Sequence, residues 1–68
     1  MGIGEFLTRI SEHPDLELLY QDPTFCIIVC KGAGGERRIR LGLWAVRRMR
    51  WEEIAAALQI ADAARLPA

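Results

Sequence analysis

The sequence predicts a mostly helical small domain, and three observations support this. An apolar stripe with helical spacing runs through the C-terminal third, prolines and glycines divide the chain into short segments, and no apolar run is as long as a membrane span. The chain has 68 residues, of which 51% are hydrophobic and 26% charged. That length fits one domain, residues 1–68, and the apolar fraction argues against intrinsic disorder.

Two short helices are expected in the N-terminal third. Residues 5–12 carry one apolar stripe, and Pro14 ends this helix. The stripe consists of Phe6, Leu7 and Ile10. Asp15 would cap a second short helix with an apolar surface. That surface would come from Leu16, Leu18, Leu19 and Tyr20.

The first six residues are expected to be dispensable or disordered. Gly2 and Gly4 disfavour a helix, and the Glu-Phe pair that follows is also what a common cloning site encodes, so part of the segment would be vector-derived. The start has neither a basic segment nor a long apolar run, so we expect no signal peptide and a cytoplasmic location.

Residues 22–32 support two interpretations. Asp22 before Pro23 is typical of a helix start, and the lysine-glycine pair that closes the segment is typical of a helix end. The run TFCIIVC is instead β-branched and apolar, as in a buried strand, and the later RRIRLGLW alternates. Helices are the preferred interpretation. The alternative is an α+β fold with a β-hairpin at residues 24–43 between helices.

Residues 43–60 are expected to be helical, because they are rich in alanine, leucine, arginine, glutamate and methionine. Apolar residues there recur with the spacing of one helix face. They are Trp51, Ile54, Ala55, Leu58 and Ala61.

The stretch MRWEEIAAALQIADAARL, residues 49–66, resembles the helix-turn-helix of bacterial transcription regulators, most closely region 4 of sigma factors. The matching residues are Met49, Arg50, Trp51, Glu52, Glu53, Ile54, Ala55, Leu58, Gln59, Ile60 and Ala61. The resemblance, over residues 37–66, implies DNA binding, with a preceding helix at about 37–47 and a recognition helix at 62–66. Gln59 stands where the family usually has a turn glycine. An ordinary amphipathic helix is the alternative for the same stretch.

Charge is segregated along the chain although the formal net charge is zero. Residues 1–30 carry a net charge of −4, residues 31–51 one of +6, and residues 52–68 one of −2. Arginine favours bidentate contacts with phosphate, so we expect these side chains to bind nucleic acid, with Arg65 as the one base reader. The expected contacts are Arg37, Arg38, Arg40, Arg47, Arg48, Arg50 and Arg65. The alternative is pairing with the acidic N-terminal half, within the chain or between subunits.

We expect no catalytic site, cofactor or metal site. Cys26, Cys30 and His13 fall short of the four ligands of a structural zinc site, so two buried thiols are expected. Ser11 and His13 are too close in sequence to form a catalytic pair. The loop KGAGGERR lacks the Lys-Ser/Thr pair of a nucleotide-binding P-loop.

The predicted function is therefore a small cytoplasmic nucleic-acid-binding module in transcription regulation. Its binding would be largely independent of sequence and steeply dependent on salt. The alternative is a homo-oligomeric or partner-binding module with no nucleic-acid or catalytic role and no membrane partner. In that case four apolar residues would pack across an interface between chains. They are Trp44, Trp51, Ile54 and Leu58.

Overall fold

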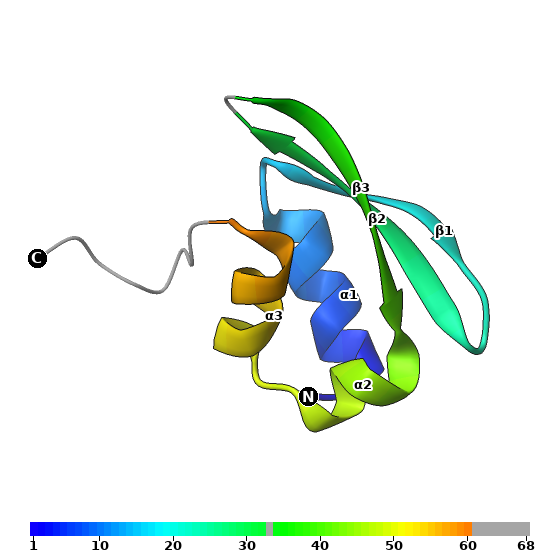
Figure 1. Cartoon of the computed structure of the whole chain (residues 1–68). Coiled ribbons are helices and arrows are strands. Elements are labelled where there is room, and N and C mark those ends of the chain that lie inside the picture. The colour runs from blue at the N-terminus through cyan, green and yellow to red at the C-terminus, as the bar shows by residue number, and fades with distance from the viewer. Residues whose placement is uncertain (33, 61–68) are drawn as a thin grey trace, which may run out of the picture.

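The computed structural model describes residues 1–32 and 34–60 (Figure 1). Three antiparallel strands form one sheet in the order β1-β2-β3, and the helices lie on one side of it (Figure 1). The elements in chain order are α1 (Ile3–Glu12), β1 (Leu16–Gln21), β2 (Phe25–Gly32), β3 (Gly35–Gly42), α2 (Leu43–Arg48) and α3 (Trp51–Leu58). The other side of the sheet carries no helix among these described residues.

The prediction of a mostly helical domain is wrong, because the chain has an α+β fold with a three-stranded sheet. The hairpin that the sequence left open as an alternative is formed by β2 and β3. The segment after Asp15, predicted to be a second helix, is strand β1. Its position depends on β2, since the Lys31 N–H donates to the Asp15 carbonyl at 2.8 Å and Leu16 pairs with Cys30.

Asp22 explains why a helix start was predicted where a turn occurs. Its Oδ1 accepts hydrogen bonds from the backbone N–H groups of Thr24 at 2.8 Å and Phe25 at 3.0 Å. A helix N-cap makes the same two bonds, from a carboxylate to the N–H groups two and three residues later. The local sequence therefore fits both structures, and the pairing of β1 with β2 selects the turn.

The core lies between the sheet and the helices. Side chains alternate along β2, so Cys26, Ile28 and Cys30 all point into the core, where each is at most 1% exposed. Both cysteines are free and buried, as expected, and burial raises the pKa of each thiol. Their main partners from the other elements are Phe6, Ile10, Leu16, Leu43, Val46, Trp51, Ile54, Ala55 and Leu58.

The C-terminal helices differ from the prediction in two ways. The helix expected at about 37–47 begins only at Leu43, because residues 37–42 belong to β3. The continuous helix expected over 43–60 is broken at residues 49–50 into α2 and α3. Gln59 ends α3 in the left-handed conformation, with φ 57° and ψ 43°, at the turn that the resemblance places there. The recognition helix predicted at 62–66 lies outside the described residues.

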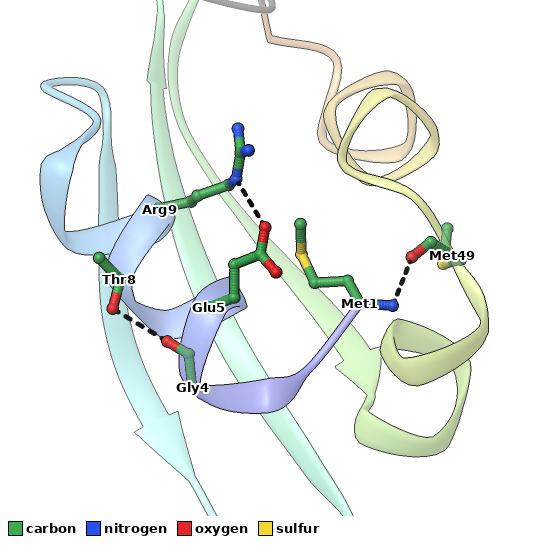
Figure 2. A network of polar contacts seen from close by, with 6 residues as sticks. All are labelled: Met1, Gly4, Glu5, Thr8, Arg9 and Met49. Carbon is green, nitrogen blue, oxygen red and sulfur yellow. Dashed lines mark hydrogen bonds and ion pairs between the residues drawn. The ribbon is translucent and has the colours of Figure 1, made fainter.

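The N-terminal residues pack against the link between α2 and α3. The Met1 amino group donates to the carbonyl of Met49 at 3.0 Å (Figure 2). It also donates to the carbonyl of Arg47 at 3.0 Å. On α1 itself, Glu5 forms an ion pair with Arg9 at 3.6 Å (Figure 2). Phe6 is fully buried beneath this turn. Residues 1–6 were expected to be dispensable or disordered. They instead supply part of the core.

The variant Phe6→Ala tests this packing. We expect it to lower the free energy of unfolding by about 3–5 kcal/mol, because it leaves a cavity in the core. Urea denaturation followed by circular dichroism measures the change. Leu19→Ala is the control, since Leu19 is 49% exposed and its loss is expected to cost under about 0.5 kcal/mol. Equal effects of the two variants would show that Phe6 is not a core residue.

Candidate nucleic-acid interface

The side of the sheet away from the helices carries the candidate site. Because side chains alternate, the residues of β2 between the core positions point to this side. The strand register places Arg40 beside Ile27 and Arg38 beside Val29, so arginines border an apolar central row. We call this surface the open face. It consists of Glu17 and Tyr20 of β1, Phe25, Ile27 and Val29 of β2, and Arg38 and Arg40 of β3.

Two aromatic rings and one guanidinium group lie together on the open face. The ring centroids of Tyr20 and Phe25 are 5.4 Å apart, within the usual range for an aromatic pair. The guanidinium carbon of Arg40 lies 4.3 Å from the centroid of the Phe25 ring, which is a cation–π contact. A planar cation and two rings therefore form one continuous surface.

The turn at Asp22 fixes the orientation of Tyr20. The Tyr20 hydroxyl donates to Asp22 Oδ2 at 2.9 Å, and this bond raises the pKa of the phenol. The carboxylate also accepts the Thr24 hydroxyl at 2.7 Å, in addition to its two backbone bonds. These hydrogen bonds, with that of Thr24 the largest, hold the pKa of Asp22 well below its usual range.

Trp44 continues this surface onto α2. Its side chain is 69% exposed, and a Cβ atom added to Gly42 would lie only 3.0 Å from the indole Nε1. Gly42 is the cross-strand partner of Phe25, so the indole lies next to the aromatic pair. Arg48 makes a cation–π contact with the same indole, its guanidinium carbon lying 5.8 Å from the Trp44 ring centroid.

A shallow groove adjoins Trp44. Its volume is about 320 Å³. The lining residues are Pro23, Leu43, Trp44, Arg47 and Arg48. Two arginines of α2 therefore border the groove directly beside the exposed indole.

Arg37 has a different role from its neighbours on β3, because it points to the helical side of the sheet. Its Nη2 donates to the Leu58 carbonyl at 2.8 Å and its Nη1 to Gln59 Oε1 at 3.1 Å. These bonds satisfy a carbonyl at the end of α3 and place a positive charge at the negative end of the helix. They also hold Gln59 in a backbone conformation that is costly for a residue with a side chain.

The other predicted phosphate contacts lie in three places. Arg38 and Arg40 are on the open face, and Arg47 and Arg48 border the groove. Arg50 precedes α3, where its backbone N–H donates to Glu53 Oε1 at 2.9 Å. Arg65 lies outside the described residues. The structure thus places four of the seven predicted arginines in two pairs, one on the open face and one beside the groove.

Three of the four residues predicted for an interface between chains are buried in this chain. Trp51 is 7% exposed, Ile54 and Leu58 are fully buried, and Arg9 covers the Trp51 ring at 5.4 Å. Trp44 is the exposed member of the set. An apolar helical stripe looks the same in sequence whether it faces its own core or another chain, which is why these residues were grouped together.

Tyr20 and Phe25 were not predicted as site residues. Tyr20 was expected on an apolar helical surface, and Phe25 lay in the segment for which a helix and a hairpin strand were both considered. The signal that could have found them is the alternation of Arg38 and Arg40 with apolar residues, combined with a strand interpretation of the preceding run.

The comparisons add no family to this geometry, since no protein-family model, curated protein or solved structure matches the chain. Among residues 1–32 and 34–60, no three histidine, cysteine or acidic side chains are grouped as a metal site would need. None of the helices in that part of the chain has the length and apolar character required to cross a membrane.

The contrast between Arg37 and Arg38 can be tested directly. We expect Arg37→Ala to lower the free energy of unfolding by about 1 kcal/mol, because it removes two hydrogen bonds at the end of α3. Arg38→Ala is the matched control and should change stability by less than about 0.5 kcal/mol. Thermal and urea denaturation measure both. Equal losses would contradict the capping role of Arg37.

The lowered pKa of Asp22 predicts a dependence of stability on pH. Its contribution is fully present above about pH 4, the usual carboxyl pKa, and is lost as the pH falls toward the lower pKa of the folded state. The melting temperature should therefore fall less between pH 5 and pH 2 in Asp22→Asn than in the unmodified protein. Identical slopes in the two proteins would contradict the assignment of the turn.

Proposed function

We propose that this chain binds nucleic acid through the open face and the adjoining end of α2. Four arginines contact backbone phosphates, and they do so with little dependence on base sequence. The four are Arg38, Arg40, Arg47 and Arg48. The ligand is the one expected from the sequence, a nucleic acid. The mode of binding differs, because a sheet surface contacts the ligand in place of a recognition helix.

The observation that carries the proposal is the lack of carboxylate partners for these four side chains. Among the described residues, the ion pairs are Arg9–Glu5 at 3.6 Å and Lys31–Glu17 at 3.5 Å. Within residues 1–32 and 34–60, none of these four arginines therefore forms an ion pair with the acidic N-terminal half. Their guanidinium groups are free to make charge-assisted hydrogen bonds to phosphate.

The distribution of acidic residues favours the same face. Glu5 and Glu12 belong to α1, and Glu52 and Glu53 belong to α3, so all four lie on elements of the helical side. Glu17 and Glu36 share the open face with Lys31, Arg38 and Arg40, so basic side chains outnumber acidic ones there by one. A polyanion is attracted to this local excess of positive charge.

Fluorescence anisotropy with a labelled oligonucleotide, over a salt series, tests the proposal. We expect binding that weakens log-linearly with salt, with a slope of roughly 0.7 for each phosphate of a single strand that the protein neutralises. The double variant Arg38→Ala/Arg40→Ala should bind more weakly and with a smaller slope. The single variants Arg38→Ala and Arg9→Ala each remove one positive charge and form the charge-matched comparison, because Arg9 lies on α1 and pairs with Glu5.

No binding at low salt would overturn the proposed function. Equal losses of affinity in Arg38→Ala and in Arg9→Ala would also contradict it, since nonspecific attraction to total positive charge would then explain the binding. Circular dichroism of each variant shows whether the fold is retained.

Self-association is the second candidate function, and strand β1 favours it. Leu18 and Leu19 of this edge strand are 38% and 49% exposed. An exposed apolar edge is a template for pairing with another chain, although the bulge between Leu18 and Tyr20 interrupts it. Analytical ultracentrifugation of the protein and of Leu19→Lys separates the two candidates, because self-association through β1 requires a dimer that this variant dissociates.

A further inference from the structure

We propose that the preferred nucleic acid is single-stranded, with its bases stacked on Tyr20, Phe25 and Trp44. This inference rests on the proposed function and specifies its substrate class. Tyr20 and Phe25 form an aromatic pair, and Trp44 lies beside Gly42, the cross-strand neighbour of Phe25; we call these three residues the aromatic row. It runs from β1 across β2 to the start of α2.

The distribution of aromatic residues supports this row. The chain has two tryptophans, two phenylalanines and one tyrosine. Phe6 and Trp51 are buried in the core, whereas Tyr20 and Phe25 pair on the open face and Trp44 lies beside Gly42, the cross-strand partner of Phe25. Tyr20 is 46% exposed and Trp44 69% exposed, so their faces are accessible to a ligand.

The geometry of the row suits unstacked bases. In a duplex the faces of the bases are covered by their neighbours, whereas a single strand can place each base on an aromatic ring or a guanidinium plane. Tyr20 and Phe25 are 5.4 Å apart, and Arg40 over Phe25 adds a planar cation to the same surface. Arginines thus stand close enough to the rings for one strand to use both kinds of contact.

Tyr20 and Phe25 are held in place before any ligand arrives. The Tyr20 hydroxyl is bonded to Asp22, and Phe25 contacts both Tyr20 and Arg40. The missing side chain at Gly42 gives the Trp44 indole its place close to the end of β3. Little side-chain entropy therefore remains to be lost on binding, which favours affinity.

The test compares a labelled 12-nucleotide oligothymidine with a labelled 12-base-pair duplex at one salt concentration, by anisotropy. We expect the single strand to bind at least about tenfold more tightly. Trp44→Ala should weaken single-strand binding by roughly 5- to 100-fold, the usual effect of removing one base–aromatic stack, and should leave duplex binding within about twofold. Trp44→Phe should restore part of the affinity.

Two controls separate stacking from other effects. Tyr20→Phe keeps the ring without the hydroxyl and should bind the single strand almost as well as the unmodified protein, whereas Tyr20→Ala should not. Arg38→Ala/Arg40→Ala should weaken binding to both ligands. Trp44 is largely exposed, so Trp44→Ala is expected to fold normally.

The outcomes distinguish this inference from the proposed function. Equal affinity for single strand and duplex, with Trp44→Ala unchanged on both, would overturn the inference and leave the proposed function standing. No binding of either ligand at low salt would overturn both.

Discussion

The central strand β2 is apolar on both of its faces, and the rest of the structure depends on how each face is covered. Cys26, Ile28 and Cys30 are buried by the helices. The opposite row, Phe25 and two aliphatic residues, is bordered only by side chains of the neighbouring strands. No helix covers this row among the described residues (Figure 1), so only side chains of the sheet cover it. They bury Val29 and leave Phe25 and Ile27 half-buried.

The helices are held in place from several directions because each is too short to be stable alone. Arg37 reaches from β3 to the end of α3, and Met1 reaches the link between α2 and α3 (Figure 2). Phe6 and Ile10 join α1 to the sheet. These interactions connect distant parts of the chain. They do not involve Arg38 and Arg40, and Arg40 contacts the Phe25 ring on the open face at 4.3 Å.

Helices that follow from the local spacing of apolar residues could be predicted from the sequence. Strands that depend on pairing with a distant segment could not. The helix before Pro14 follows from apolar spacing and was predicted, and the helical character of residues 43–60 was predicted without the break at residues 49–50. The turn at Asp22 was mistaken for a helix start because both use the same hydrogen bonds. The arginine cluster was visible in the sequence, whereas its division between Arg37 on one side and Arg38 on the other depends on the strand register. Tyr20 and Phe25 became a pair only through that register.

The central claim is that the open face is the binding surface. Heteronuclear NMR of the labelled protein, titrated with the oligothymidine strand, tests it most directly. We predict that the indole N–H of Trp44 and the backbone amides of Phe25, Ile27 and Arg40 shift together, while the amides of α1 and α3 stay unchanged. Shifts confined to the helical side, with the open face unaffected, would contradict the claim.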